Sequence, residues 1–162
     1  MIQREIQKIL EKQLFKKKVI LTYGARRVGK TTLSRQLLKK IDKSRYINCE
    51  LLENKSALET TNSIELKSFL GHYRLIVLDE AQYIREIGRI LKIVADTFPE
   101  IQVIATGSSS FELGNRLSEP LTGRSREFLL YPFSISELLG KEDPITINAS
   151  LEKILRFGLY PD

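Results

Sequence analysis

Short apolar runs alternate along the chain with segments in which apolar residues recur every three or four positions. The short runs predict strands and the periodic segments predict helices. Strands are expected at 18–23, 45–48, 75–78, 101–105 and 127–130. Helices are expected at 2–14, 30–42, 64–70, 86–97 and 149–157, with an irregular stretch at 51–63. This alternation is typical of a three-layer α/β/α domain with a mainly parallel five-stranded sheet.

Two further short helices are predicted from capping boxes, in which a serine is followed three residues later by a glutamate. Ser109–Glu112 and Ser134–Glu137 both have this spacing. The serine hydroxyl and the glutamate carboxylate each satisfy a backbone N–H group that the first helical turn leaves free. Gly140 is expected to end the second of these helices, and Gly158 is expected to end the last helix of the chain.

The residues that follow the first predicted strand match a phosphate-binding loop, G-x-x-x-x-G-K-[ST], at every fixed position, and an amphipathic helix comes directly after them. The expected binding segment is Gly24, Ala25, Arg26, Arg27, Val28, Gly29, Lys30, Thr31 and Thr32. The glycines allow a tight turn whose N–H groups point at phosphate oxygens, and the helix N-terminus adds its dipole. Lys30 is expected to reach the β- and γ-phosphates, and Thr31 is expected to ligate Mg²⁺.

Two acidic residues, Asp79 and Glu80, follow the apolar strand predicted at 75–78. The carboxyl ends of parallel strands lie on the ligand-binding edge of a sheet. Asp79 is therefore expected to hold Mg²⁺ through water, and Glu80 is expected to polarise a water for attack on the γ-phosphate. The strand predicted at 45–48 lies between this segment and the phosphate loop. That order fits the division of P-loop proteins that activates water better than the kinase–GTPase division.

Five separated segments of the chain read GARRVGKTTL, LIVLDEAQYI, VIATGSSSFEL, LTGRSREFLLYPFSISEL and GLYPD. In this order they resemble the AAA+-like archaeal and bacterial ATPases of the AAA_14 family, over residues 4–162. The resemblance implies ATP and Mg²⁺ as ligands. In this family the P-loop domain is usually followed by a C-terminal region. We therefore expect residues 1–162 to form a single ATPase domain and to be the N-terminal fragment of a longer pattern.

The resemblance also implies further catalytic groups. AAA+-like ATPases place a polar sensor residue after the fourth strand, and Thr106 and Ser108 both fit that position. Arg124 precedes the fifth predicted strand and resembles the arginine that related ATPases present to a γ-phosphate, often across a subunit interface. Arg116 and Arg126 compete with Arg124 for this role.

Two functions remain open at this point. The first is Mg²⁺-dependent ATP hydrolysis, with Glu80 as the base. Gln82, just beyond Glu80, is then a candidate to orient water or to signal to a neighbour, with a plain loop residue as the alternative. The second is an ATP-gated switch or assembly module that hydrolyses ATP only when a partner completes it. A small-molecule kinase is less well supported, because no lid segment can be named after the fourth strand. The partner itself is left open between a second copy of the chain, another protein and a nucleic acid.

Charge is unevenly distributed along the chain. Residues 1–45 contain 14 Lys/Arg and 3 Asp/Glu, whereas residues 46–162 contain 12 and 17. The lysines at 16–18 and 39–43 form either a solvated face or a nucleic-acid contact. The single cysteine, Cys49, excludes an internal disulfide and is expected to be a small buried side chain. Because no apolar run approaches the ~20 residues needed to span a bilayer, no membrane partner and a cytoplasmic location are expected.

Overall fold

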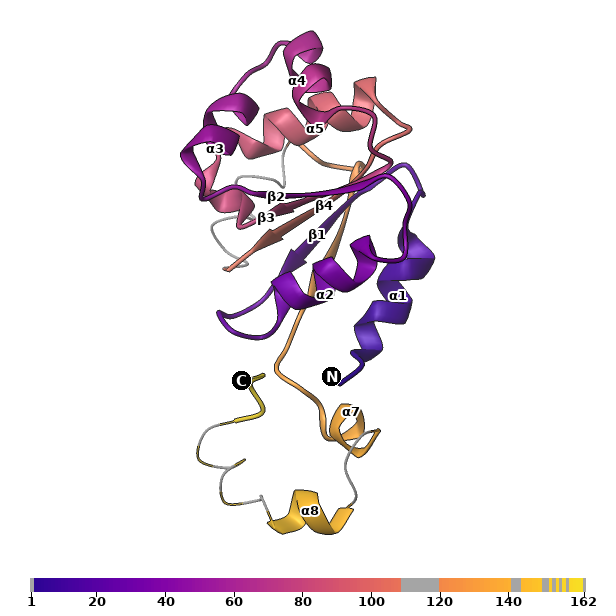
Figure 1. The fold of residues 1–162 in the computed structure, drawn as a ribbon, viewed down its shortest axis with the longest axis vertical. Coiled ribbons are helices and arrows are strands. Elements are labelled where there is room, and N and C mark those ends of the chain that lie inside the picture. The colour runs from indigo at the N-terminus through magenta and orange to yellow at the C-terminus, as the bar shows by residue number, and fades with distance from the viewer. Residues whose placement is uncertain are drawn as a thin grey trace.

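A computed structural model of the chain describes residues 2–108, 120–140, 144–149 and 158–161, together with 152, 154 and 156. Five strands form one sheet in the order β2-β3-β4-β1-β5 (Figure 1). The strands are β1 (Val19–Tyr23), β2 (Ser44–Asn48), β3 (Leu75–Asp79), β4 (Gln102–Gly107) and β5 (Ser125–Leu129). All four pairings between these strands are parallel, which confirms the predicted α/β class.

Helices cover both faces of the sheet, as the three-layer prediction requires. They are α1 (Glu5–Gln13), α2 (Lys30–Leu38), α3 (Leu52–Leu58), α4 (Ser63–Leu70), α5 (Ile87–Thr97), α7 (Ile135–Leu139) and α8 (Pro144–Ala149), with a 3-10 turn η1 (Ala81–Tyr83). One face of the sheet carries α1 and α2, and the other carries α3, α4 and α5 (Figure 1). The short helices α7 and α8 lie apart from the sheet, below it in the same view.

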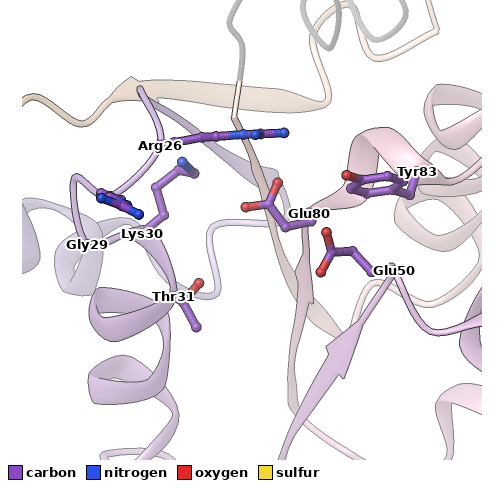
Figure 2. Close-up of a pocket in the computed structure, with 8 residues that line it drawn as sticks. Arg26, Gly29, Lys30, Thr31, Glu50, Glu80 and Tyr83 are labelled. Atoms are coloured by element: carbon purple, nitrogen blue, oxygen red, sulfur yellow. The ribbon is translucent and has the colours of Figure 1, made fainter.

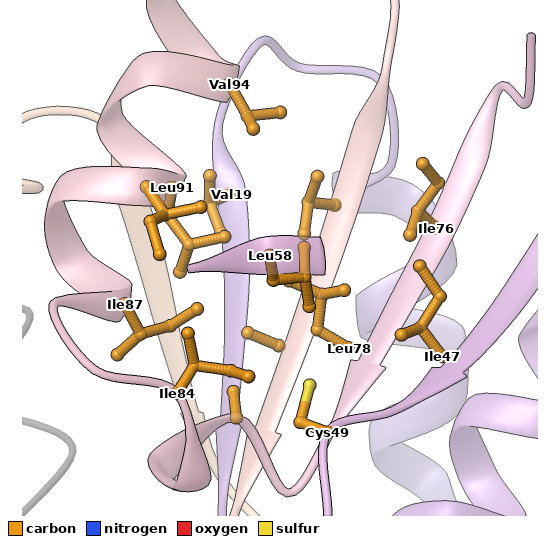
Figure 3. Close-up of a cluster of buried hydrophobic side chains, with 14 of the residues drawn as sticks. Val19, Ile47, Cys49, Leu58, Ile76, Leu78, Ile84, Ile87, Leu91 and Val94 are labelled. Atoms are coloured by element: carbon orange, nitrogen blue, oxygen red, sulfur yellow. The ribbon is translucent and has the colours of Figure 1, made fainter. Parts of the chain in front are cut away.

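Successive residues of the strands point into two separate cores. Val19 and Leu21 belong to the core beneath α5, whereas Ile20 between them belongs to the core beneath α2. Figure 3 shows the first of these cores, with Ile87 and Leu91 of α5 turned towards the strands. A strand that is buried on both faces appears in the sequence as a continuous apolar run. This explains why β1, β3 and β4, which are buried along their whole length, could be predicted. The partly exposed β2 and β5 contain only short apolar stretches.

Cys49 lies in the core beneath α5 and is fully buried, as expected. Burial raises the pKa of its thiol to about 12, and the carboxylates of Asp79 and Glu80 act in the same direction. The thiol is therefore protonated at neutral pH.

The prediction of an irregular stretch at 51–63 was wrong, because α3 and the start of α4 lie within it. Helix α3 fully buries Leu58 and leaves Leu52 76% exposed, so it lacks the apolar stripe that would reveal a helix. Helix α4 begins at an asparagine cap, since the Asn62 side chain accepts a hydrogen bond of 2.9 Å from the Ile64 N–H.

The C-terminal predictions were met in part. The Ser134–Glu137 capping box is present with both of its hydrogen bonds, and Gly140 is the C-cap of α7. Helix α8 was not predicted. In the helix expected at 149–157, residues 152, 154 and 156 are helical, and the Gly158 N–H donates to the Ile154 carbonyl. The Ser109–Glu112 box lies outside the described residues.

Within the described residues, no helix combines the length and the apolar character needed to cross a bilayer.

Candidate functional site

A pocket of about 310 Å³ lies at the carboxyl edge of the sheet, where the loop after β1 faces the residues that follow β2 and β3. Its lining residues come mainly from the phosphate loop and from the strand ends. They are Arg26, Arg27, Gly29, Lys30, Thr31, Glu50, Glu80 and Tyr83. Figure 2 shows the acidic side chains of Glu50 and Glu80 on one side of this pocket, across from Arg26 and Lys30 on the other. The basic side of the pocket suits an anionic ligand, and the acidic side suits a cation that binds with it.

Lys30 begins α2 and its side chain folds back over the phosphate loop. The ammonium donates to the carbonyls of Gly24 and Ala25, at 2.9 Å each. Burial lowers the pKa of Lys30, while the carboxylates of Glu80 and Asp79 oppose that shift. The loop thus holds a desolvated cation whose two acceptors are neutral carbonyls, and phosphate oxygens would be stronger acceptors for it.

The two glycines of the loop have different roles. Gly29 has φ +93°, a left-handed conformation that glycine adopts without steric cost. At Gly24, a Cβ atom would lie 2.3 Å from the carbonyl oxygen of Leu130. Gly24 therefore allows the chain after β5 to pass directly against the loop. Arg27, between the glycines, also has positive φ, at +66°, so the loop is strained at a residue with a side chain.

The structure brings together the two predicted ligands of Mg²⁺. The Thr31 hydroxyl donates to Oδ2 of Asp79 at 2.7 Å. Asp79 is almost fully buried and also accepts hydrogen bonds from the hydroxyls of Tyr46 and Thr106. A carboxylate and a hydroxyl are suitable ligands for Mg²⁺, which keeps several waters and takes further oxygens from substrate phosphates. The residues present therefore fit the ion.

Tyr46 was missed by the sequence analysis. Its hydroxyl donates to Oδ2 of Asp79, and its ring lies 4.8 Å beneath the Arg35 guanidinium. Burial raises the pKa of Tyr46 to about 12, and the hydrogen bond to Asp79 adds to the shift. The phenol therefore stays protonated at neutral pH. It donates a hydrogen bond to the Asp79 carboxylate and so orients it.

Glu80 stands in a strained left-handed conformation, with φ +55°, directly after β3. Its backbone N–H donates to the Thr106 hydroxyl at 3.2 Å, and its carboxylate accepts a hydrogen bond from the Gln82 amide. The same amide of Gln82 reaches the Ser108 hydroxyl at 3.2 Å. A chain of polar contacts thus joins the predicted base to one of the two predicted sensor residues.

Thr106 and Ser108 differ in their surroundings. Thr106 is fully buried, and its hydroxyl is engaged by Asp79 and by the Glu80 N–H. Ser108 is partly exposed and contacts Gln82. Thr106 therefore fixes the two acids relative to each other, whereas Ser108 remains accessible.

Of the arginines proposed to contact a γ-phosphate, Arg124 and Arg126 do not line this pocket. Arg124 precedes β5, whose first residue pairs with Val19 at the start of β1, and the phosphate loop follows the other end of β1. Its guanidinium is paired with Asp96 at 2.6 Å. Arg126 contacts Gln13, and Arg116 lies outside the described residues. A role of Arg124 at a nucleotide therefore remains a prediction, and it would require a second copy of the chain.

Glu50 and Tyr83 also line the pocket, although no role was predicted for either. Tyr83 lies in the LIVLDEAQYI segment, whereas Glu50 belongs to no motif recognised in the sequence. Glu50 follows β2, which pairs with β3 so that Asn48 lies beside Asp79. The carboxyl ends of parallel strands share one edge of the sheet. The position of Glu50 just after a predicted strand could therefore have indicated that it lies at the pocket.

A buried arginine supports the phosphate loop from behind. The Arg4 side chain donates to the Val28 carbonyl at 2.8 Å and forms an ion pair with Glu137 at 3.0 Å. A Cβ atom added at Gly29 would lie within 4 Å of both Arg4 and Pro161. The N-terminus, α7 and the residues near the C-terminus thus meet at the loop. From the sequence, Glu137 was predicted only as part of a capping box.

The parallel sheet and the phosphate loop that joins β1 to α2 define an AAA-type P-loop domain. Residues 16–139 match the AAA_14 family, described as an AAA domain, and the chain belongs to this family.

The chain is similar to the uncharacterized protein MJ1637 of Methanocaldococcus jannaschii, with 32% identity over 170 residues that cover 95% of this chain and 34% of the relative. Among solved structures, the Walker-type ATPase PABY2304 of Pyrococcus abyssi has a TM-score of 0.64 at 20% identity, covering 95% of this chain and 59% of that one. The Aeropyrum pernix Orc1 protein in complex with DNA has a TM-score of 0.62 at 18% identity, covering 97% and 56%. The chain thus spans about a third of the curated relative, and the two structures support the fold.

Proposed function

We propose that this domain binds ATP together with Mg²⁺ and hydrolyses the γ-phosphate. The observation that carries the proposal is the hydrogen bond from Thr31, which lines the pocket with Lys30 and Glu80, to the buried carboxylate of Asp79. A hydroxyl at a helix N-terminus, a buried carboxylate, a lysine and a second carboxylate are the groups that a P-loop ATPase needs. Membership of the AAA_14 family supports ATP as the nucleotide.

Each residue then has a defined task. Lys30 exchanges the carbonyls of Gly24 and Ala25 for phosphate oxygens. Thr31 and Asp79 would hold Mg²⁺, and the bound ion would neutralise phosphate charge. Glu80 accepts a hydrogen bond from the attacking water and then its proton, so its carboxylate must be ionised and correctly aimed.

Gln82 is suited to aim that carboxylate, because its amide contacts both Glu80 and Ser108. A γ-phosphate oxygen near Ser108 could then influence the position of Glu80 through Gln82. This makes Ser108 the better sensor candidate and Thr106 a residue that positions the two acids.

A second candidate function is an ATP-gated switch with little hydrolysis of its own. The position of Arg124, paired with Asp96 at the far edge of the sheet, favours it. An arginine supplied by another subunit contributes about 10³–10⁵-fold to the rate of related enzymes, so a site without one would be slow. The client could be a second copy of the chain or another macromolecule. The DNA held by the Orc1 structure makes nucleic acid one class to test.

The test is a titration of a fluorescent ATP analogue with Mg²⁺, paired with a measurement of phosphate release. The variants are Lys30→Ala and Glu80→Gln, and Lys92→Ala on the exposed surface of α5 is the matched control. We expect Lys30→Ala to lose nucleotide binding. We expect Glu80→Gln to bind like wild type and to release phosphate roughly 100-fold more slowly, within the range for a lost general base.

Two other outcomes are informative. If the wild type and Glu80→Gln bind equally and neither releases phosphate even at high protein concentration, the switch replaces hydrolysis as the function. If the wild type does not bind the nucleotide, the central proposal is wrong.

A further inference from the structure

The edge of the sheet opposite the nucleotide pocket carries a basic surface. The loops that precede β1, β2 and β3 lie there, because these parallel strands all begin at the same edge (Figure 1). We call this surface the basic edge and define it by Phe15, Lys16, Lys17, Lys18, Lys39, Lys40, Lys43 and Arg74. The five residues of β1 separate it from the phosphate loop, a length of about 17 Å at 3.3 Å per residue.

Most of this positive charge is not neutralised. Among the described residues, only one of the seven cations of the basic edge forms an ion pair, which joins Lys40 to Glu11 at 2.7 Å. Asp42 is the one acidic residue within the loops 14–18, 39–43 and 72–74. A surface with such an excess of lysine attracts polyanions, and this attraction becomes weaker as the salt concentration rises.

The loops of the basic edge are held in place. The buried Gln102 side chain accepts a hydrogen bond from the Phe15 N–H at 2.6 Å and donates to the Lys18 carbonyl at 2.9 Å. The Arg74 N–H donates to the Lys43 carbonyl at 2.7 Å, which ties the loop before β3 to the loop before β2. The lysines thus project from a fixed backbone.

Backbone strain is concentrated at the same place. Six non-glycine residues in the described part of the chain have positive φ. Arg27 and Glu80 line the nucleotide pocket, and Glu86 is the N-cap of α5. The other three all lie in the basic edge: Phe15 at +59°, Lys17 at +56° and Lys43 at +55°. Left-handed residues with side chains are costly and gather at ligand-binding sites. Half of the left-handed residues with side chains in the described part of the chain thus lie in the basic edge.

An exposed flat pair lies among the lysines. Phe15 is 39% exposed, and the Arg74 guanidinium lies 5.1 Å from the centroid of its ring. Aromatic rings and guanidinium planes are the groups on which unpaired bases stack, and a groove of lysines beside them follows the phosphate backbone. An amphipathic membrane-binding surface would also present a continuous apolar face, whereas six of the thirteen residues in the loops of the basic edge are lysines.

We propose that the basic edge binds single-stranded nucleic acid, with the lysines on its phosphates and Phe15 and Arg74 against unpaired bases. The test is fluorescence anisotropy with a labelled 20-nucleotide oligothymidine at several salt concentrations. Saturating MgATP is present, and the measurement is repeated with Lys30→Ala, so that the phosphate loop cannot account for binding. The measurement does not depend on ATP hydrolysis.

Three variants separate charge from stacking. Lys16→Glu/Lys17→Glu is expected to weaken binding at least 10-fold and to reduce its salt dependence. Phe15→Leu is expected to weaken binding about 5-fold or more at unchanged salt dependence, because it removes stacking alone. Arg74→Lys is expected to behave like Phe15→Leu. Arg85→Glu/Lys92→Glu has the same change in net charge at exposed positions elsewhere and is expected to bind like wild type. Thermal melts verify that each variant is folded.

Several results would overturn the proposal. Equal losses in Lys16→Glu/Lys17→Glu and in Arg85→Glu/Lys92→Glu would show a general effect of net charge. Displacement of the oligonucleotide by MgATP would place it in the nucleotide pocket. Equal affinity for a duplex of the same length, with Phe15→Leu unchanged, would exclude stacking on unpaired bases. Binding to phosphatidylserine vesicles without binding to the oligonucleotide would assign the basic edge to a membrane surface.

Discussion

Arg4 and Glu137 are 133 positions apart in the chain and form a buried ion pair of 3.0 Å behind the phosphate loop. The guanidinium also donates to the carbonyls of Val28 and Tyr131, and it lies 4.7 Å from the centroid of the Phe133 ring. One side chain thus holds the N-terminus, the phosphate loop and the segment before α7. The position of α7 and the shape of the loop are therefore coupled through Arg4.

Arg4→Met is expected to destabilise the domain by about 3–5 kcal/mol, because it leaves the Glu137 carboxylate buried without its partner. The double variant Arg4→Met/Glu137→Gln is expected to lose less than the two single variants together, since no unpaired charge then remains. Urea unfolding at pH 7 measures each free energy. Lys40→Met, which breaks the exposed pair with Glu11, is the control and is expected to cost about 0–1 kcal/mol. An equal cost for Arg4→Met and Lys40→Met would contradict the coupling.

The same pair predicts how stability depends on pH. Burial alone would raise the pKa of Glu137, but the N–H groups of Ser134 and Glu5 and the Arg4 guanidinium outweigh it and lower the pKa below its usual 4.5. A carboxyl with a depressed pKa stabilises the fold above its unfolded pKa, and this contribution is lost as pH falls through the folded value. The stability advantage of wild type over Glu137→Gln is therefore expected to be constant from pH 8 to about 5.5 and to shrink below about 4.5.

Urea midpoints of both proteins across this pH range provide the measurement. Other depressed carboxyls, such as Glu11 and Glu100, are common to both proteins and cancel in the difference. A difference that stays constant down to pH 3.5 would show that Glu137 does not titrate as a stabilising carboxylate.

Gly24→Ala is expected to impair both stability and nucleotide binding. The new Cβ would lie 2.3 Å from the Leu130 carbonyl, so either the loop or the chain after β5 must move. Such overpacking typically costs about 1–3 kcal/mol. Gly140→Ala is the matched control, because Gly140 has φ −67° and its nearest contact to a Cβ would be 3.4 Å. Thermal melts and nucleotide titrations should show lower stability and weaker nucleotide binding for Gly24→Ala than for Gly140→Ala. Equal behaviour would show that the close approach of the Leu130 carbonyl does not restrict the residue at position 24.

The parts of the site that sequence could predict depend on short-range spacing. The loop from Gly24 to Thr31 is one continuous motif, and Asp79 was placed because it ends an apolar strand. The structure joins these two segments through the Thr31–Asp79 hydrogen bond. By contrast, Tyr46 and the Arg4–Glu137 pair are brought to the site by tertiary packing, and no local pattern marks a tyrosine or an arginine that will meet a distant carboxylate.

Arg124 shows a different limit. Its assignment came from resemblance alone, although the sequence already placed it before a strand rather than after one. In a parallel sheet the two ends of a strand lie at opposite edges, and the ligand-binding edge is the carboxyl one. The register of β5 with β1 shows this directly, since Ser125 lies beside Val19 and Leu129 beside Tyr23. The position of Arg124 in the sheet therefore limits its possible role more strongly than the family resemblance does.

Ser108→Ala and Thr106→Val are expected to have different effects. Ser108 touches the predicted base only through Gln82, so its loss is expected to slow phosphate release roughly 10-fold, less than the ~10²–10³ typical of a direct donor. Nucleotide affinity should be unchanged. Thr106→Val removes hydrogen bonds to Asp79 and from the Glu80 N–H in a buried setting, so it is expected to cost about 1–3 kcal/mol of stability. Phosphate release and urea unfolding are measured for both variants. If Thr106→Val slowed phosphate release without loss of stability and Ser108→Ala lowered stability instead, the sensor role would be assigned to Thr106.

Arg124 can reach a γ-phosphate only in a second copy of the chain, and this predicts complementation between two inactive variants. Arg124→Ala retains Glu80, while Glu80→Gln retains Arg124, so each lacks one group that the other can provide. Each alone is expected to release phosphate slowly, with Arg124→Ala about 10³-fold below wild type if the arginine acts as in related enzymes. A mixture of the two is expected to regain turnover, because Arg124 of one chain can then serve the Glu80 site of the other.

The supporting measurement is turnover per chain against protein concentration, which must rise for the wild type if subunits complete each other. Arg124→Ala mixed with the double variant Glu80→Gln/Arg124→Ala controls for the presence of a second chain, since neither partner then carries Arg124 and no turnover should be regained. If Arg124→Ala alone equals wild type at every concentration, the 2.6 Å contact with Asp96 is an ordinary surface ion pair. In that case charge on the transferred phosphate would be met by bound Mg²⁺ together with Lys30 and the arginines of the phosphate loop, which are the cations among the described residues that line the pocket.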